Sequence, residues 1–180
     1  SPKDNPFLQI QSLHRDDWRK YTGMVDELVQ QLSPGAERVE EHDFFEVVGQ
    51  DDENFTIFIV RDIEKNPEGE FIGMATIFFR HLLSGWVGEI HDVVVDKHYF
   101  RQGFGRMLTQ HIFDYTNIRA KKLGKPIKLC LTSKPHREAA NAMYVKAGFE
   151  LIAQAVIERD PATGMEVVKG TNLYRKVINP

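Results

Sequence analysis

The stretch Glu89-Ile-His-Asp-Val-Val-Val-Asp-Lys-His-Tyr-Phe-Arg-Gln-Gly-Phe-Gly-Arg-Met-Leu108 decides the fold of this chain. It passes from a β-branched strand through a short polar loop into two glycines that open an amphipathic helix. The first N–H groups of a helix have no intrahelical partner, and the aligned peptide dipoles leave partial positive charge there. Because Gly103 and Gly105 have no Cβ, a ligand can approach the backbone closely. The stretch therefore predicts an anion site, flanked by Arg101 and Arg106.

Length and composition favour a globular protein. At 180 residues and 42% hydrophobic content, one domain spanning residues 1–180 is expected to bury a substantial core. No run approaches ~20 consecutive apolar residues, and the first residues lack a signal-peptide pattern. We therefore expect a cytoplasmic protein without a membrane partner. Acids and bases are interspersed at a net charge of −3, so no basic surface for nucleic acid is predicted.

The N-terminal half predicts two helical stretches and an antiparallel meander. Residues 7–12 alternate as a half-buried strand does, and apolar residues recur at helical spacing from Trp18 to Leu32. A less regular helical stretch follows at 36–48. Three β-rich runs then lie at 55–60, 71–79 and 86–95, with turn chemistry at 66–70 between the first two.

The C-terminal half adds a parallel step. The helix after Gly103 is expected to bury one face, which carries Leu108, Ile112, Tyr115 and Ile118 or Arg119. A short apolar strand at 127–132 follows it, and strand, helix, strand in this order suggests a parallel crossover. A helix at 135–147 and two strands at 150–159 and 167–177 complete the pattern. The fold class is therefore α/β, a mixed sheet with one parallel central pair and helices on both faces.

Two motifs at this spacing resemble the GCN5-related N-acetyltransferase superfamily. Phe100-Arg101-Gln102-Gly103-Phe104-Gly105 is similar to the family's Gln/Arg-x-x-Gly-x-Gly/Ala, with Phe100 where Gln or Arg is usual. Asn141-Ala-Met-Tyr144-Val-Lys-Ala-Gly-Phe149 is similar to its Asn-x-x-Tyr-x-x-x-Gly-Phe, and is the more specific motif. The resemblance covers nearly the whole chain and is nearest to bacterial-type members of unassigned substrate. It implies the family's acyltransferase fold and the transfer of an acetyl group from acetyl-coenzyme A (acetyl-CoA) to an amine. We expect the acceptor to be the primary amine of a small molecule.

The resemblance also implies site residues. Tyr144 would protonate the departing thiolate, since a phenol with a pKa near ~10 remains a donor at neutral pH. Asn141 would make a polar contact to the cofactor, or would be a helix-surface amide. The remaining cofactor-binding residues would line the pantetheine arm and the pyrophosphate: Val93, Val94 and Val95 for the first, and Arg101, Gln102, Gly103, Phe104, Gly105 and Arg106 for the second.

A protonated amine must lose a proton before it attacks, so a base or a water relay is required. Glu89, His91 and Asp92 lie near the end of the central strand, and the resemblance implies that Glu89 is at a position that supplies a glutamate base in some members and Asp92 at one used for substrate contact or base function in others. We therefore rank Glu89 first, Asp92 second and His91 third as the base. The alternative for each is a surface charge or a paired structural carboxylate. Period-two alternation places Glu89, His91, Val93 and Val95 on one face and Asp92 on the other, an assignment that a β-bulge would change.

Other residue types predict no further chemistry. We expect the single cysteine, Cys130, to be a small buried hydrophobic residue rather than a nucleophile. The seven histidines show no metal-ligand spacing. No metal site is therefore predicted. Two alternatives to a small-molecule enzyme remain open, a non-catalytic acyl-CoA-binding sensor or interaction module and an acetyltransferase of protein lysines or N-termini. A homodimer is also left open.

Overall fold

The computed structural model describes residues 2–48, 53–65 and 71–180, so the turn expected at 66–70 lies outside the described residues. Short 3-10 turns lie at Pro2–Asp4, Arg15–Asp17 and Lys97–Tyr99. The helices and strands are, in chain order, β1 (Leu8–Ser12), α1 (Trp18–Leu32), α2 (Glu41–Val48), β2 (Phe55–Asp62), β3 (Gly73–Leu82), β4 (Gly85–Val95), α3 (Phe104–Leu123), β5 (Ile127–Ser133), α4 (Glu138–Lys146), β6 (Glu150–Ala153), β7 (Val156–Arg159), β8 (Glu166–Lys169) and β9 (Asn172–Ile178).

The main sheet has the predicted mixed character. Within the described ranges its strand order is β1-β2-β3-β4-β5-β9-β6. The β4–β5 pair is parallel, whereas the other neighbouring pairs of this sheet are antiparallel. The predicted fold class, with an antiparallel meander first and one parallel central pair, is therefore confirmed.

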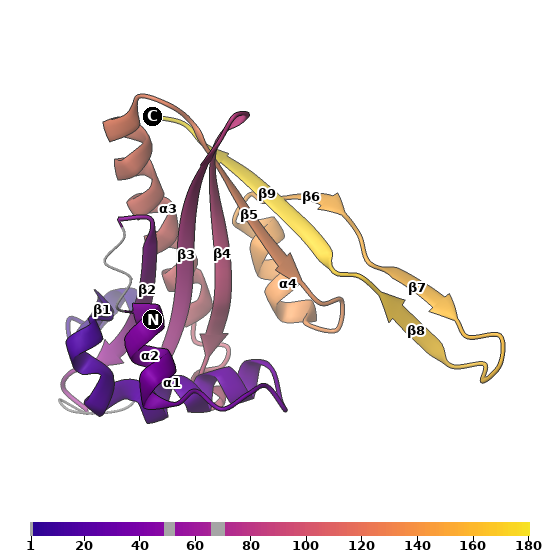
Figure 1. The fold of residues 1–180 in the computed structure, drawn as a ribbon, viewed down its shortest axis with the longest axis horizontal. Helices are drawn as coiled ribbons and strands as arrows, with labels where there is room; N and C mark the ends of the chain where they lie inside the picture. The colour runs from indigo at the N-terminus through magenta and orange to yellow at the C-terminus, as the bar shows by residue number, and fades with distance from the viewer. Residues whose placement is uncertain (1, 49–52, 66–70) are drawn as a thin grey trace.

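Helices cover both faces of the sheet (Figure 1). On one face, α3 and α4 pack on a core that includes Ile77, Leu108 and Leu129. On the other face, α1 and α2 pack on a second core that includes Ile59 and Met74. Below we call these the α3 face and the α1 face.

The buried stripe of α3 differs from the prediction at its C-terminal end. Leu108 and Ile112 are fully buried as expected. Of the two alternatives at the C-terminal end, Ile118 is 56% exposed, whereas Arg119 is partly buried with its guanidinium over the rings of Phe79 and Trp86. Thr116 and Ala120 continue the buried stripe instead. The spacing of four residues keeps side chains on one helical face, and Ile118 lies off that face.

A β-bulge interrupts β4. His91 pairs with Thr76 and Val94 pairs with Met74, so two residues of β4, Asp92 and Val93, lie opposite a single residue of β3. The backbone of Asp92 has a φ of 52°, a left-handed conformation that accommodates the extra residue of the bulge. Every side chain beyond the bulge therefore changes face relative to simple alternation.

The predicted grouping of Glu89 and His91 with Val93 and Val95 is consequently wrong. Val93 and Val95 pack against the core of the α3 face, whereas Val94 belongs to the core of the α1 face. Glu89 and His91 pair with Phe78 and Thr76, which alternate along β3 with residues of the α3-face core. Glu89 and His91 therefore lie on the α1 face, on the same side as Val94.

Each of the two predicted C-terminal strands is broken in two. Residues 150–153 and 172–178 remain in the main sheet as β6 and β9, while β7 and β8 form a separate two-stranded sheet. This β7–β8 arm projects away from the rest of the chain (Figure 1). The pairing of β6 with β9 shifts register between Leu151 and Ala153, where the strands leave the main sheet.

Candidate active site

The site forms where the two parallel strands separate. The β4–β5 ladder runs from Trp86–Ile127 to Glu89–Cys130 and then stops. Figure 1 shows the strands side by side at one end and apart at the other. We call residues 90–95 of β4 and 131–133 of β5 the strand parting. Unpaired edges of this kind can bind an extended ligand through backbone hydrogen bonds.

Two residues of β4 present backbone groups to the strand parting. The carbonyl oxygen of Val93 accepts a hydrogen bond from Arg137 Nη2 at 3.1 Å, and that of Val95 accepts one from Gln31 Nε2 at 2.6 Å. Asp96 N donates toward β3, to the carbonyl of Ile72. Because backbone groups alternate along a strand, Val93 and Val95 face the parting while Val94 faces β3. Val94 is buried with its side chain in the α1-face core.

The loop that contains Gly103 and Gly105, which we call the glycine loop, leads into the start of α3, where unpaired N–H groups can bind an anion. Gly103 is the N-cap of α3 with a φ of 91°, and its carbonyl accepts the bond of Met107 N at 3.0 Å. The N–H groups of residues 104–106 therefore have no partner inside the helix. A Cβ on Gly105 would lie 3.0 Å from Met143 Sδ, so this glycine permits the close approach of α3 to α4. The ring of Phe104 is buried and anchors the loop to the core.

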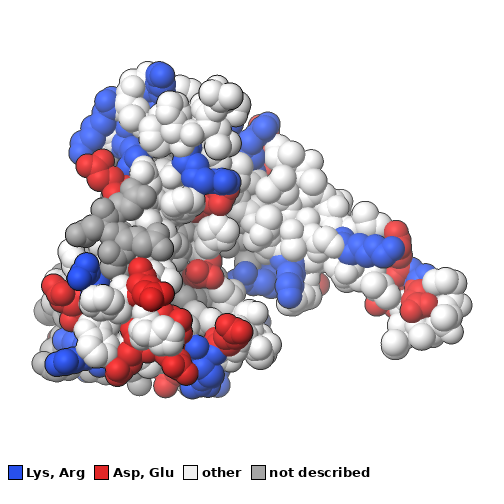
Figure 2. Space-filling view, viewed as in Figure 1, with Lys and Arg blue, Asp and Glu red and all other residues white. Residues whose placement is uncertain are grey.

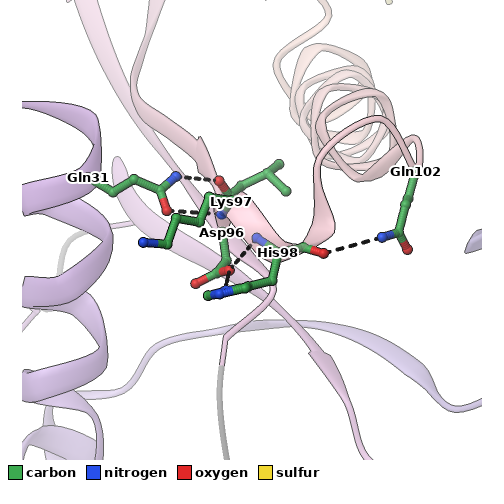
Figure 3. Close-up of polar contacts among 6 residues, drawn as sticks. Gln31, Asp96, Lys97, His98 and Gln102 are labelled. Atoms are coloured by element: carbon green, nitrogen blue, oxygen red, sulfur yellow. Dashed lines mark hydrogen bonds and ion pairs between the residues drawn. The ribbon is translucent and has the colours of Figure 1, made fainter.

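A polar network holds the segment that leads into this loop (Figure 3). The side chain of Gln31, at the end of α1, donates to Val95 O and accepts from Lys97 N at 3.0 Å. Asp96 Oδ1 accepts from His98 N at 2.8 Å and lies 2.7 Å from His98 Nδ1. Gln102 Nε2 donates to His98 O at 3.4 Å. Helix α1 thus orients the loop that carries the free N–H groups.

A basic groove of about 790 Å³ lies between α3 and α4. Arg106, Lys146 and Lys176 line it together with the apolar side chains of Phe113 and Met143. Three cations beside an apolar wall suit a phosphorylated aromatic ligand. The sequence indicated Arg106 but missed Lys146 and Lys176, since those two residues reach the groove from α4 and β9.

The structure separates the two arginines that flank the glycines. Arg101 and Gln102 line a second groove of about 510 Å³, which Asp62 and Lys65 share. Arg101 also has a φ of 62°, a strained conformation for a residue with a side chain. Arg106 alone of the two arginines therefore lies in the basic groove beside α4.

Tyr144 lies on the α3 face with its side chain packed among aromatic rings. It is 2% exposed, and its ring centroid lies 5.8 Å from that of Phe149 and 5.7 Å from that of Tyr174. Burial raises the pKa of Tyr144 above 10, and the nearby charge of Arg137 offsets part of that rise. The phenol is therefore protonated at neutral pH and can act as a proton donor.

Glu89 is the last residue of β4 that pairs with β5, at the apex of the strand parting. Its carboxylate forms an ion pair with Arg80 and lies 3.4 Å from His91 Nε2. Asp92 projects from the bulge and is exposed. Since Glu89 lies on the α1 face and Tyr144 on the α3 face, the strand parting separates the candidate base from the candidate acid.

Asn141 and Cys130 have well-defined surroundings. The amide of Asn141 bonds with the carbonyls of Lys134 and Arg137 and with the hydroxyl of Tyr174. Cys130 is half-buried, and burial raises the pKa of its thiol. A thiol held in its neutral form is a poor nucleophile, as the sequence suggested for this residue.

Neither a metal cluster nor a membrane helix occurs in the described part of the chain. Within residues 2–48, 53–65 and 71–180, no three His, Cys, Asp or Glu side chains are grouped to hold a metal ion. Over those same ranges, no helix combines the length and apolar character needed to cross a bilayer.

Residues 10–149 match the family model described as acetyltransferase (GNAT) family. The chain belongs to the GNAT family. A search of curated proteins finds no match to this GNAT chain. The predicted superfamily is thereby confirmed, and the strand parting, the glycine loop and Tyr144 all lie inside the matched residues.

Solved acetyltransferases share the fold of this GNAT protein at low sequence identity. A GNAT acetyltransferase from Streptococcus pneumoniae has a TM-score of 0.71 at 14% identity, over 96% of this chain and 99% of the other. Arabidopsis thaliana NAA60, solved with acetyl-CoA, has a TM-score of 0.67 at 16% identity, over 96% and 99%. An aminoglycoside acetyltransferase from an uncultured soil metagenomic sample, solved with sisomicin, has a TM-score of 0.65 at 17% identity, over 83% and 93%.

Proposed function

We propose that this protein is an N-acetyltransferase that moves an acetyl group from acetyl-CoA to the primary amine of a small molecule. The observation that carries the proposal is the strand parting, since β4 leads from it to the unpaired N–H groups at the start of α3 and β5 leads from it to α4, which carries the buried Tyr144. Two structures of similar fold support this proposal. NAA60 was solved with acetyl-CoA, which supports the cofactor, and the other protein is an aminoglycoside acetyltransferase, which supports a small-molecule acceptor.

The cofactor would lie along three features already described. The backbone groups of Val93 and Val95 would pair with the amides of the pantetheine arm. The N–H groups of residues 104–106 would bind the pyrophosphate. Arg106, Lys146 and Lys176 would bind the phosphorylated adenosine end in the groove between α3 and α4.

The chemistry would proceed by direct attack. The amine nitrogen forms a bond to the thioester carbonyl carbon, and the carbon–sulfur bond then breaks. Before the attack the protonated amine loses one proton to Glu89 or to a water held there, and after the attack the nitrogen loses a second proton to solvent. The departing sulfur takes the proton of the Tyr144 hydroxyl, which solvent then returns. The carboxylate of Glu89 forms an ion pair with Arg80, so a water could carry the proton between the amine and this carboxylate.

Binding and chemistry can be tested separately. Acetyl-CoA at 100 times its Kd should stabilise the protein by about 2.7 kcal/mol and raise its Tm. Release of free thiol with a panel of small amines would measure turnover. The absence of both a Tm shift and thiol release would contradict the proposal.

Tyr144→Phe tests the proton donor. Loss of general acid catalysis should lower kcat by about 10²-fold or more, because the hydroxyl acts in the transition state. The Kd for acetyl-CoA should change much less, since the ring remains. A variant with unchanged kcat would remove Tyr144 as the acid.

A further inference from the structure

The side-chain amide of Asn141 is fully occupied by the protein itself. Its Nδ2 donates to Lys134 O at 3.0 Å and to Arg137 O at 2.9 Å. Its Oδ1 accepts from the hydroxyl of Tyr174 at 2.8 Å and lies 3.4 Å from Nδ2 of Asn172. An amide side chain offers two N–H donors and one oxygen with two lone pairs. These four contacts use that capacity and leave none for a ligand.

The partners of Asn141 come from separate parts of the fold. Lys134 and Arg137 belong to the connection between β5 and α4, whereas Asn172 and Tyr174 belong to β9. Both β9 residues are buried. Asn172 Oδ1 also accepts from Ala155 N at 2.9 Å, at the point where the chain leaves β6 for the β7–β8 arm. One amide therefore joins the start of α4 to the main sheet.

Helix α4 needs such a connection because it is short. It has nine residues, and isolated helices below ~12–15 residues are marginal in water. Asn141 lies three residues before Tyr144, on the same side of the helix. Tyr174, which donates to Asn141, also packs its ring against that of Tyr144. The position of the phenol therefore depends on these bonds.

The same amide also bears on the opposite wall of the strand parting. Asn141 holds the carbonyl of Arg137, and the guanidinium of Arg137 reaches across to Val93 O at 3.1 Å. Displacement of the Arg137 backbone would move a cation that lies near Tyr144 and bonds to β4. Asn141 thus influences both sides of the site without contacting it.

We infer that Asn141, together with Tyr174, is a positioning residue that orients Tyr144, and that it is not a cofactor contact. This inference rests on the proposed acetyl transfer, in which Tyr144 is the proton donor. It replaces the expectation that Asn141 binds acetyl-CoA directly.

A double-mutant cycle tests the inference. Tyr174→Phe removes one hydrogen bond and should lower kcat by up to about tenfold, whereas Asn141→Ala removes all four contacts of the amide and should lower kcat by at least as much; the Kd for acetyl-CoA should change less than about twofold in both. The double variant should be no slower than the slower single variant, because both changes break one unit. Asn117→Ala is the matched control, since Asn117 donates to Asn179 O at 2.9 Å, away from this network, and kcat should be unchanged.

A spectroscopic readout works without any activity. With 3-fluorotyrosine incorporated, the ¹⁹F resonance of Tyr144, assigned by its loss in Tyr144→Phe, should shift or broaden in both single variants. Tyr174→Phe removes one hydroxyl and keeps the ring, so it provides a folded test if Asn141→Ala unfolds.

Two results would overturn the inference. One is an Asn141→Ala variant in which the Kd for acetyl-CoA rises tenfold or more while kcat and the ¹⁹F signal are unchanged, which would identify a cofactor contact. The other is a lower Tm in both variants with neither kcat nor the ¹⁹F signal altered. If the wild type releases no thiol, the proposed function fails, and the ¹⁹F signal still decides whether Asn141 orients Tyr144.

Discussion

Burial of single side chains controls the protonation of several residues in this protein. Tyr144 and Cys130 are both shifted toward their neutral, protonated forms because water is excluded around them. For Tyr144 this keeps a donor available at neutral pH, whereas for Cys130 it suppresses the thiolate. The same physical effect therefore favours one candidate catalytic group and argues against the other.

His111 shows the same effect as a contribution to stability. Its ring packs edge-on against that of Phe58, with centroids 4.6 Å apart, and burial lowers its pKa below 6.5 while Asp114 offsets part of the shift. Below pH 6.5, His111 binds a proton more readily in the unfolded chain than in the folded protein. The free energy of unfolding should therefore fall as pH decreases through this range. His111→Gln should flatten that fall, as measured by denaturant unfolding at a series of pH values.

Asp114→Asn provides the matched comparison. Asp114 favours the protonated form of His111, so its removal should lower the pKa of the folded state further and steepen the loss of stability below pH 6.5. Parallel pH profiles in the wild type and both variants would refute the role assigned to His111.

At the level of secondary structure, the bulge in β4 is the feature on which the site depends. Because of the bulge, the side chain of Val94 packs in the α1-face core, while the backbone groups of Val93 and Val95 face the strand parting. Gly73 permits the geometry, because a Cβ at this position would lie 2.7 Å from the carbonyl oxygen of Val94. Backbone atoms cannot move aside as the end of a flexible side chain can.

Gly73→Ala should therefore destabilise the protein by about 1–3 kcal/mol, as overpacking typically does, and should weaken acetyl-CoA binding by disturbing β4. Gly23→Ala, the same chemical change inside α1, meets nothing within 4 Å and should stabilise by up to ~1 kcal/mol through helix propensity. Chemical denaturation and cofactor titration measure both effects. Equal effects of the two substitutions on stability would contradict the packing argument.

Over the whole molecule, charge is distributed unevenly even though the net charge is −3. Figure 2 shows acidic side chains gathered on the part built by α1 and α2. Four exposed glutamates lie in or just before α2: Glu37, Glu40, Glu41 and Glu46. The proposed cofactor groove instead carries Arg106, Lys146 and Lys176. The α1 face, on which Glu89 lies, is therefore flanked by negative charge.

This distribution should favour cationic acceptors. We expect a polyamine such as spermidine to have a higher kcat/KM than an anionic amine such as glucosamine 6-phosphate, by about tenfold or more at low salt. The difference should shrink as ionic strength rises, because salt screens exposed charges. Steady-state kinetics at two salt concentrations measure it, with a Glu40→Gln/Glu41→Gln variant as the control. A preference for the anionic amine would contradict this prediction.

The β7–β8 arm should behave as a separate unit. A two-stranded sheet alone is marginally stable in water, and Val156, Ile157 and Val168 on the arm are exposed. Its backbone amides should therefore exchange with deuterium much faster than those of the central strand β5. Mass spectrometry of peptides covering residues 156–169 and 127–133 provides the comparison. Equal protection would show that another surface covers the arm.

The sequence by itself determined what depends on local pattern. The helix that ends at Leu32, the meander, the parallel crossover and the anion-binding start of α3 were predictable, because period and turn chemistry act over a few residues. Tyr144 was identified because its motif is contiguous, and the family match confirms the superfamily to which the motif pointed. Its role as the acid, like those of Glu89 and the cofactor-binding residues, stays a proposal.

Only the tertiary structure decided which residues meet across the fold. A single inserted residue at Asp92 moved Glu89 and His91 away from the face of Val93, and no periodicity announces such a bulge. Lys146 and Lys176 line the same groove as Arg106 but belong to other elements. The hydrogen-bonding groups of the Asn141 amide are bonded to residues up to 33 positions away in the sequence. These contacts are set by packing between distant segments, whereas sequence patterns report on the backbone of their own segment.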